Sequence, residues 1–519
     1  MDNNAREKRE FIPLPLHLLT DHVNPNYSPG ITEEEREEYR KVLEENGKSV
    51  GFSLQFVGAV RGPATTLCVV KLSGETTEKD LLEGKTAFQM LFRTPHGVSF
   101  VKDGKNEGYY GILVPNKTTE CVSLRKVLDS DAYLSAQGEL PVALGKTSDG
   151  DVLVEDLASL GNILVTGETG SGKSVFIAQL LTQLIMRYSP ERFRFIPVDV
   201  KGGVELGIFA DAPHVANGEL FDSCEKTDKA FAEVVREIRN RLDLLNAYNV
   251  KSIKEYNALD GVPRLPYLLF VIDEASEIVL QGRETRSILE KIAEILHGKG
   301  KELAIGMLFA TQNPVRDVIT ANLAKNMNTK VVFRMFDAER SMLVLHKRGA
   351  EGLCGRGDGL FVRPTGTVRF QCAYASVDDV DNVINALCSD VCQEPEEKEE
   401  PAAPVAPAVP EEPPKDEPVE TDDITQDEPV VVCEEEKIMW EALRICVETG
   451  HVSLSYLQRK LRRGYNFIAN LLDEMVLDGY LEQRKEDDRM RLYVSISEEE
   501  FEKEWEKRFG KYDPDTDGE

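Results

Sequence analysis

The sequence predicts an α/β fold built on a parallel β-sheet, and two observations support that prediction. An apolar run at 162–166 is followed by a glycine-rich stretch, 167–174, and then by an apolar-rich segment, 175–186. A second run, 268–272, is apolar throughout, as expected for a central strand buried on both faces. Strand, loop and helix therefore alternate as in a doubly wound sheet.

The glycine-rich stretch has the spacing of a phosphate-binding loop, G-x-x-x-x-G-K-S. Its glycines let successive backbone N–H groups point at phosphate oxygens, and the following helix adds its positive N-terminal end. Lys173 is expected to neutralise the β- and γ-phosphates of a bound triphosphate, and Ser174 to hold Mg²⁺. A structural glycine turn is the alternative. The predicted nucleotide-binding residues are Gly167, Glu168, Thr169, Gly170, Ser171, Gly172, Lys173, Ser174 and Val175.

Polar residues at two predicted strand ends indicate hydrolysis as well as binding. Asp273 and Glu274 follow the apolar run 268–272, at the edge of the sheet where the phosphate loop also lies. Asp273 is expected to bind Mg²⁺ together with Ser174, and Glu274 to orient or deprotonate the attacking water. Carboxylates that only cap the next helix are the alternative. Gln312 ends a further strand candidate and either senses the γ-phosphate or makes only local hydrogen bonds.

Composition divides the 519 residues into segments of different character. Between residues 393 and 436 there are 17 acidic residues, two lysines and nine prolines, so this stretch cannot bury a core and is expected to be an extended linker. The predicted organisation is an irregular segment at 1–30, an α+β domain at 31–139, the motor domain at 140–392, the linker at 393–433, a small domain at 434–496 and an acidic tail at 497–519.

The net charge of −29 argues at first against a nucleic-acid partner, because phosphate repels carboxylate. The charge is segregated, however. Residues 449–472 carry four basic residues and no acid, so a basic surface is available locally. The nine cysteines form no C-x-x-C pair, no apolar run approaches the roughly 20 residues that span a bilayer, and the N-terminus lacks the apolar core of a signal peptide. We therefore expect a soluble, cytoplasmic protein.

With these residues in place, the chain resembles the FtsK/SpoIIIE family of double-stranded DNA translocases over almost its whole length. The resemblance rests on an ordered series of stretches: 113–116, 122–128 and 140–146 before the phosphate loop, and 198–201, 256–257, 310–314 and 352–359 within the motor. It implies a RecA-like motor domain that uses ATP and Mg²⁺ and works as a ring, expected to be a homo-hexamer. Arg334 or Arg340 is then the candidate arginine that reaches a neighbouring subunit, and we favour Arg340. We expect the family's membrane-spanning region to be missing.

The end of the chain resembles the family's C-terminal winged-helix domain. Residues 453–466 read as a helix, a tight turn and the start of a second helix, and Ile468, Leu471, Leu472 and Met475 are expected to face the core. Phe467 and Asn470 stand where the family often has arginines. A small helical protein-interaction module is the alternative. The residues predicted to contact DNA are Arg459, Lys460, Arg462, Arg463, Tyr465, Asn466 and Asn470.

The sequence therefore predicts an ATP-driven motor that moves along double-stranded DNA in chromosome segregation or DNA transfer. The first rival is a coupling or processivity factor of a mobile element or phage. A secretion ATPase that moves protein, and a DNA-bound regulator that uses ATP as an assembly switch, are rivals of other classes. The predicted winged helix favours DNA, and it offers a surface for recombination or transfer proteins.

Overall fold

The computed structural model describes residues 11–102 and 108–388, together with parts of the C-terminal region. Contacts between residues divide the chain into two compact units, Met1–Cys392 and Gln393–Glu519. The described residues of the second unit are 434–449, 452, 457, 460–461, 468, 471–472, 475–476, 479–486, 489–497, 500–503 and 505.

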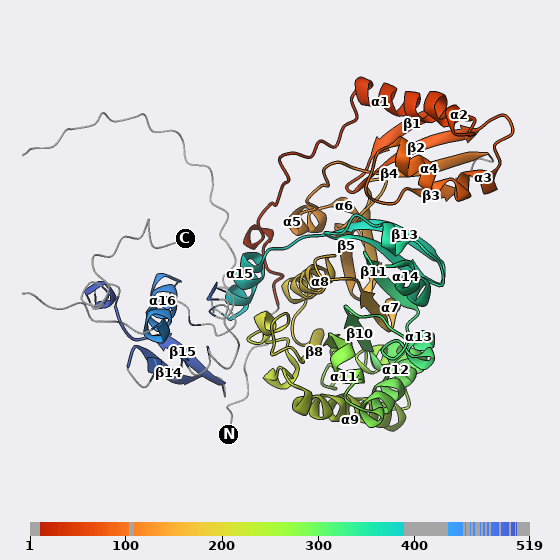
Figure 1. Cartoon of the computed structure of the whole chain (residues 1–519). Helices are drawn as coiled ribbons and strands as arrows, with labels where there is room; N and C mark the ends of the chain where they lie inside the picture. The colour runs from red at the N-terminus through yellow and green to blue at the C-terminus, as the bar shows by residue number, and fades with distance from the viewer. Residues whose placement is uncertain are drawn as a thin grey trace, which may run out of the picture. The chain divides into compact units, whose positions relative to one another are not determined.

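The first unit begins with an irregular segment and a small α+β domain (Figure 1). A four-stranded antiparallel sheet forms this domain in the order β1-β2-β4-β3. Its strands are β1 (Leu54–Arg61), β2 (Thr65–Leu72), β3 (Ser99–Lys102) and β4 (Tyr109–Pro115), and its helices are α1 (Glu33–Arg40), α2 (Gly47–Ser49), α3 (Glu78–Glu83) and α4 (Lys85–Leu91). Helix α1 starts with a capping box between Thr32 and Glu35, which satisfies two backbone N–H groups at its N-terminus.

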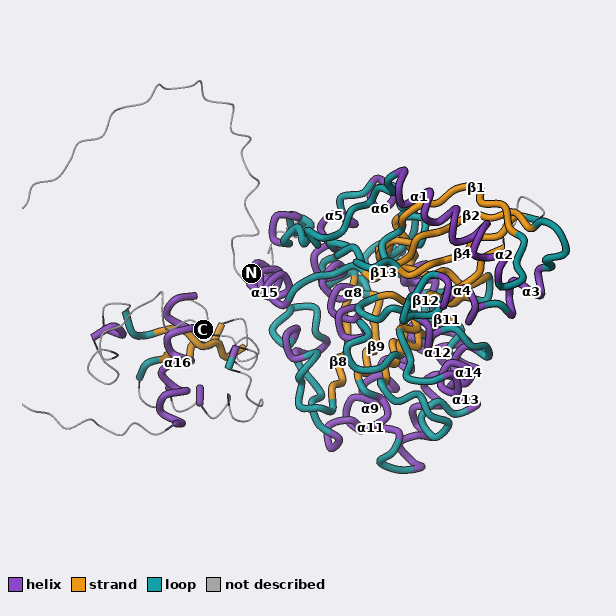
Figure 2. Tube along the Cα trace, turned by 45° about the horizontal axis from the view of Figure 1, so that its top comes forward, coloured by secondary structure: helices purple, strands orange, loops and turns teal. Residues whose placement is uncertain are grey.

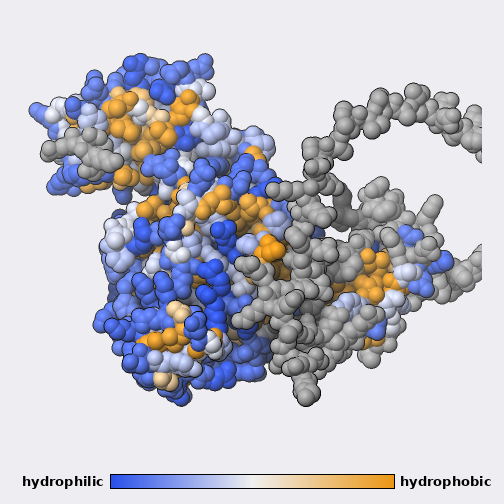
Figure 3. Space-filling model, turned by 180° about the vertical axis from the view of Figure 1, so that it is seen from behind, coloured by the Kyte–Doolittle hydropathy of each residue, from blue (hydrophilic) through white to orange (hydrophobic). Residues whose placement is uncertain are grey.

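Apolar side chains from both sides of the small domain form its core. Leu43, Cys68, Leu81, Phe88 and Ile112 are completely buried there. Other large apolar residues stay at the surface, and Figure 3 shows apolar side chains gathered over this domain. Those that are more than 45% exposed are Val57, Val60, Leu82, Met90 and Val101.

The motor domain is organised around a nine-stranded mixed sheet in the order β6-β5-β13-β12-β11-β7-β10-β9-β8. The five strands from β11 to β8 are parallel, and the four beyond β11 join antiparallel. The strands are β5 (Pro141–Thr147), β6 (Val152–Asp156), β7 (Ile163–Thr166), β8 (Phe193–Asp199), β9 (Tyr267–Asp273), β10 (Ile305–Thr311), β11 (Thr329–Phe333), β12 (Asp358–Arg363) and β13 (Gly366–Cys372).

Every residue of β7, β9 and β10 is buried, which explains why these strands read as continuous apolar runs. Strand β10 lies between β7 and β9. The carboxyl ends of all three parallel strands nevertheless meet at one edge of the sheet. The predicted α/β fold with a parallel sheet is therefore confirmed, and the antiparallel half of the sheet adds to it.

Helices pack against the motor sheet and against one another (Figures 1 and 2). Helix α8 packs against β5 and α15, whereas α12 packs against β10, α9 and α13. The motor helices are α5 (Leu124–Leu128), α6 (Asp131–Leu134), α7 (Leu157–Leu160), α8 (Lys173–Arg187), α9 (Cys224–Ala247), α10 (Ile253–Tyr256), α11 (Ala275–Val279), α12 (Arg283–Leu303), α13 (Ala321–Asn326), α14 (Ala338–Leu345) and α15 (Val377–Cys388). None of the helices in the described part of the chain combines the length and the apolar character that a membrane-spanning segment needs.

The second unit has a core of its own. Helix α16 (Glu434–Thr449) and a hairpin of β14 (Leu481–Glu486) and β15 (Arg489–Val494) are its described regular elements. Trp440 is fully buried, and the core also contains Leu443 and Trp505. The four residues predicted to face this core are confirmed there: Ile468, Leu471, Leu472 and Met475.

Candidate nucleotide-binding site

The predicted phosphate loop connects β7 to α8 and folds as a tight turn. Gly170 and Gly172 have backbone φ values of +74° and +119°, which residues with a Cβ atom rarely adopt. A Cβ on Gly172 would also lie 2.7 Å from Gly357, in the loop before β12. Glycine is thus required at position 172 both by the backbone conformation and by the close approach of a second loop.

The loop lysine makes a buried ion pair with the first strand-end carboxylate. Lys173, at the start of α8, contacts Asp273, at the end of β9, and the two side chains are only 3% and 1% exposed. Burial raises the pKa of Asp273, against the opposing effect of the Lys173 charge. The other carboxylate oxygen, Oδ2, is buried without a hydrogen-bond partner among the described residues. One Asp273 oxygen therefore remains available for a ligand.

Glu274 is held by donors from several elements. Its backbone has φ +51°, an uncommon value for a residue with a side chain, where β9 passes into α11. The carboxylate accepts hydrogen bonds from the Thr311 hydroxyl at 3.0 Å and from Ser276. Lys201 Nζ lies 3.2 Å away. Burial works to raise the pKa of Glu274, but the Ser276 hydrogen bond and the two nearby lysines, Lys201 and Lys173, bring it below its usual value. The carboxylate is accordingly ionised and fixed in one orientation.

Gln312 connects this carboxylate to the phosphate loop. Its backbone N–H donates to Glu274 at 3.2 Å, and its side-chain oxygen accepts a hydrogen bond from the Thr169 hydroxyl at 3.0 Å. The residue therefore contacts both the loop and Glu274. This placement is what a γ-phosphate sensor requires, although it also shows the local hydrogen bonds of the alternative interpretation.

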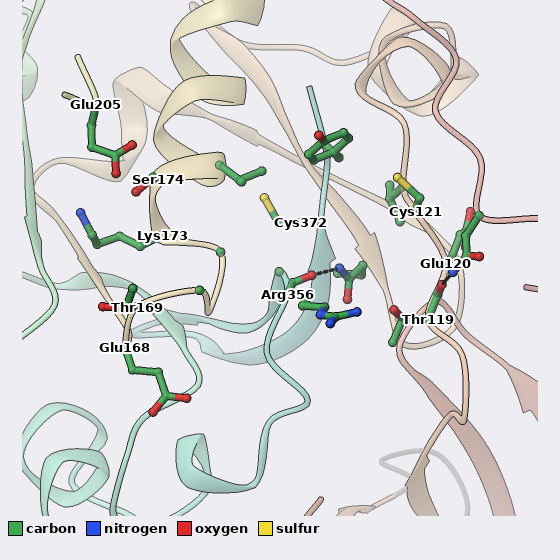
Figure 4. Close-up of a pocket in the computed structure, with 18 of the residues that line it drawn as sticks. Thr119, Glu120, Cys121, Glu168, Thr169, Lys173, Ser174, Glu205, Arg356 and Cys372 are labelled. Carbon is green, nitrogen blue, oxygen red and sulfur yellow. Dashed lines mark hydrogen bonds between the residues drawn. The ribbon is translucent and has the colours of Figure 1, made fainter. Parts of the chain in front are cut away.

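Glu205 joins the site without having been predicted from the sequence. Asp199, at the end of β8, accepts hydrogen bonds from the backbone N–H groups of Glu205 (2.8 Å) and Leu206 (3.0 Å), and these bonds shape the loop. Glu205 is placed next to Ser174 (Figure 4). Burial raises the pKa of Glu205, while hydrogen bonding from Ser174 opposes that shift. The nearby stretch 198–201 had pointed to this region only through family resemblance.

The loop residues line a cavity of about 450 Å³, a volume within the usual range for small-molecule sites. In Figure 4, Lys173, Ser174 and Glu205 lie on one side of it, and Thr119, Glu120 and Cys121 on the other. Arg356 and Cys372 lie between these two groups. The cavity therefore extends from the phosphate loop to a segment that precedes the motor sheet in the chain.

The donor set at the phosphate loop fits Mg²⁺. This ion prefers oxygen ligands and commonly binds through one or two protein side chains together with phosphates and water. The free Oδ2 atom of Asp273 and the Ser174 hydroxyl supply such oxygens, and the Glu205 carboxylate lies beside them. These residues are the ones that would hold the ion.

Both arginine candidates make ion pairs within the chain. Arg334 pairs with Glu168 of the phosphate loop, and the Arg334 carbonyl accepts a hydrogen bond from the Glu168 N–H at 2.9 Å. Arg340 Nη1 lies 2.5 Å from Asp337 at the start of α14. Arg340 also lies over the ring of Phe336, which is 80% exposed. A second cavity of about 300 Å³ is lined by Arg340 and Phe336 together with residues 167–169. Arg340 is thus near the loop, on a different cavity from the one in Figure 4.

One of the seven residues predicted to contact DNA belongs to the described part of the chain. Lys460 is exposed in a helical segment. The other six lie outside the described residues: Arg459, Arg462, Arg463, Tyr465, Asn466 and Asn470.

A phosphate loop between a buried strand and a helix, with an acidic pair on a second strand of the same sheet, places the protein among the P-loop nucleoside triphosphatases. Residues 123–316 match the FtsK/SpoIIIE family, and residues 433–493 match the Ftsk gamma domain, a winged-helix domain. Two regions of the chain, residues 123–316 and 433–493, thus correspond to domains of the FtsK/SpoIIIE family, a family of P-loop ATPases.

Relatives of the chain include DNA translocases. It is 29% identical over 482 residues to the "DNA translocase FtsK" of Caldanaerobacter subterraneus subsp. tengcongensis, a match covering 92% of this chain and 64% of the relative. It is 31% identical over 481 residues to the "DNA translocase FtsK" of Clostridium tetani, covering 89% of this chain and 60% of the relative. The chain therefore spans less than two thirds of the length of these proteins.

Among solved structures, the chain is similar to the pCW3 conjugation coupling protein TcpA, with 24% identity and a TM-score of 0.47 over 69% of this chain and 99% of TcpA.

Proposed function

We propose that the protein is an ATPase that moves along double-stranded DNA, in chromosome segregation or in DNA transfer. The observation that carries the proposal is the buried constellation of Lys173, Asp273 and Glu274 at the mouth of the phosphate loop. The family match and the gamma domain support DNA as the track. A motor that grips the phosphate backbone needs no base sequence, because that backbone is the same throughout the duplex.

The residues of the site divide the work of ATP hydrolysis. When ATP binds, Lys173 leaves Asp273 and contacts the phosphates instead. Backbone N–H groups of the loop surround these phosphates. Bound Mg²⁺ would neutralise phosphate charge from a position at Ser174 and Asp273. Glu274, already oriented by Thr311 and Ser276, orients the attacking water.

For subunits of a ring to coordinate ATP hydrolysis, a side chain of one subunit must reach the nucleotide bound by its neighbour. In this proposal Arg340 is that group and the ring is a homo-hexamer. Support comes from its position on the cavity beside residues 167–169 and from the exposed Phe336 next to it. Release from Asp337 would free the guanidinium to stabilise charge on a neighbour's γ-phosphate.

DNA binding by the gamma domain is assigned to its basic residues. Arg459, Lys460, Arg462 and Arg463 are proposed to contact phosphates, and Tyr465, Asn466 and Asn470 to lie closer to the bases. Arginine is absent at positions 467 and 470, so sequence preference is expected to be weak and affinity to fall steeply with salt.

The proposal is tested by measuring ATP hydrolysis by the full chain with and without long duplex DNA. A DNA-dependent motor hydrolyses ATP several-fold faster with duplex than with single-stranded DNA or no DNA. The Glu274→Gln variant serves as the background control. A hydrolysis rate that duplex DNA does not change would contradict the proposal, and would favour a protein-moving ATPase or an assembly switch.

A further inference from the structure

The wall of the larger cavity that faces the phosphate loop is built from three separate parts of the chain. Asn24, the stretch 119–122 and Tyr374 all line it. Figure 4 shows Thr119, Glu120 and Cys121 across the cavity from Lys173 and Ser174. A nucleotide whose phosphates lie on the loop would direct its nucleoside part toward this wall.

The first part of this wall belongs to residues 12–24, which we name the N-terminal strap. The strap lies against the motor domain, and Figure 1 shows it as a red chain passing beside α15. The Leu14 N–H donates to the carbonyl of Met186, near the end of α8, at 2.8 Å. Leu14 and Leu19 are 7% and 1% exposed within the motor core. The strap is therefore an integral part of the motor's packing.

A buried carboxylate fixes the strap close to the cavity. Asp379, at the start of α15, accepts a hydrogen bond from the Thr20 N–H at 2.7 Å and lies 2.6 Å from His22 Nε2. Its side chain is only 1% exposed. The His22 ring in turn meets the Tyr374 ring edge to face, with the centroids 4.9 Å apart. The strap thereby supports an aromatic side chain of the cavity wall.

Hydrogen bonds join the strap to the rest of the wall. Asn24 Nδ2 donates to the Thr119 carbonyl at 2.8 Å. The Tyr374 N–H donates to the Val122 carbonyl at 2.7 Å, and the Leu124 N–H donates to the Tyr374 carbonyl at 2.9 Å. Displacement of the strap would therefore disturb the whole wall.

The cavity also contains an unpaired buried acceptor. Gln371, 5% exposed, lines the cavity, and its Nε2 donates to the Arg356 carbonyl at 2.7 Å. A carbonyl only accepts, so the amide nitrogen must face it and Oε1 points elsewhere. Within the described part of the chain, Oε1 has no hydrogen-bond partner. A buried acceptor of this kind favours a ligand that brings a donor, such as a ribose hydroxyl or an exocyclic amino group.

We propose that this wall is the subsite for the ribose and base of the nucleotide, and that docking of the N-terminal strap completes it. His22 and Asn24 are positioning residues: they act through Tyr374 and Thr119. The inference rests on the proposed function, because it takes the phosphates to lie on the phosphate loop. It assigns the strap a specific effect on the nucleoside part of the ligand and none on the phosphates.

The contributions of the nucleoside and of the phosphates can be separated by measuring how ATP and inorganic tripolyphosphate bind to the full chain. His22→Ala and Asn24→Ala are expected to weaken ATP binding by about 5- to 30-fold, as the loss of one or two contacts does. Tripolyphosphate affinity is expected to stay within about 2-fold, because its contacts lie on the loop. His17→Ala is the matched control, since His17 is an exposed histidine of the same strap, whereas it is His22 that contacts Asp379 and Tyr374.

Amide hydrogen exchange can be measured on the wild-type protein, so the result does not depend on whether a variant folds. ADP should slow exchange of the Thr20 amide, which is bonded to Asp379, and tripolyphosphate should not. The inference is overturned if both strap variants keep wild-type ATP affinity, or if ATP and tripolyphosphate weaken in parallel. Failure of the wild-type chain to bind either ligand would instead refute the proposed function, and the inference with it.

Discussion

The two sides of the nucleotide cavity are built in different ways. The loop side consists of consecutive residues, 167–174, whose path is set by glycines with positive φ. The opposite side joins Asn24, Thr119 and Tyr374, which come from distant parts of the chain and are connected through hydrogen bonds. The first side depends on local backbone geometry, and the second depends on the tertiary fold. Changes on the two sides should therefore affect phosphate binding and nucleoside binding separately.

The largest effect is expected on the loop side. Lys173→Ala removes the charge that meets the phosphates, and ATP affinity should fall by at least about 1,000-fold in a direct titration, consistent with the loss of a buried charged contact. The same change leaves Asp273 buried without its partner, so the free energy of unfolding should fall by about 3 kcal/mol. Adding Asp273→Asn should restore much of that stability without restoring binding. Retained ATP affinity in Lys173→Ala would show that the loop does not bind phosphate.

Glu274→Gln separates binding from chemistry on the same side. The amide keeps the size of the side chain but loses the charge that Lys201 and the Ser276 hydroxyl stabilise. ATP should still bind, while steady-state turnover falls at least about 100-fold. Ser276→Ala, which removes one donor and leaves the carboxylate, should reduce turnover much less. Wild-type turnover in Glu274→Gln would exclude a catalytic role for this residue.

The difference between the two sides also explains what the sequence can predict. Lys173, Ser174, Asp273 and Glu274 could be predicted as site candidates because short-range patterns mark them: a fixed loop spacing and a carboxylate pair at the end of an apolar run. The strands expected at the apolar runs 162–166 and 268–272 agree with the structure for the same reason. Strands β7, β9 and β10 read as continuous apolar runs because they are buried on both faces.

Contacts between residues far apart in the sequence leave no comparable short-range pattern. His22 and Asp379 lie 357 positions apart, and nothing near either residue marks it as a partner of the other. Glu205 reaches Ser174 only because Asp199 binds the intervening loop through backbone N–H groups. The insertion of β10 between β7 and β9 is also a property of the sheet, since strand order is not encoded in any single segment.

Substitution of Arg340 tests whether a neighbouring subunit contributes a side chain to the nucleotide site. If Arg340 acts on a neighbour, mixing wild-type protein with Arg340→Ala should reduce ATPase activity by several-fold more than the inactive fraction predicts. Arg334→Ala is the comparison, because Arg334 pairs with Glu168 of its own loop and should act within its own subunit. A proportional decrease for Arg340→Ala, or a fully active monomer in sedimentation, would rule out this role.

His214 lies on neither side of the cavity and should show the smallest effect. Burial lowers the pKa of His214 to about 4, and its ring bonds the Tyr188 carbonyl at 2.7 Å. In the unfolded chain a histidine titrates near 6.5. The contribution of neutral, buried His214 to the free energy of unfolding is therefore complete above that pH and is lost as the pH falls toward 4. Between about pH 7.5 and about pH 5.5 this residue alone should cost roughly 1 kcal/mol of unfolding free energy.

Urea unfolding of the wild type and of His214→Gln at the two pH values measures that cost, which the variant should lack. Tripolyphosphate affinity should be the same in both proteins. An equal pH dependence in wild type and variant would mean that His214 is not the group responsible.

The most direct test of the account is the position of a bound nucleotide in an experimental structure of the full chain with ADP or a non-hydrolysable ATP analogue. We predict that the phosphates lie against residues 170–174 and that the base lies beside Tyr374, with Asn24 and the strap in place around it. A base bound instead in the second cavity, which Phe336 and Arg340 line, would contradict the account of the two sides.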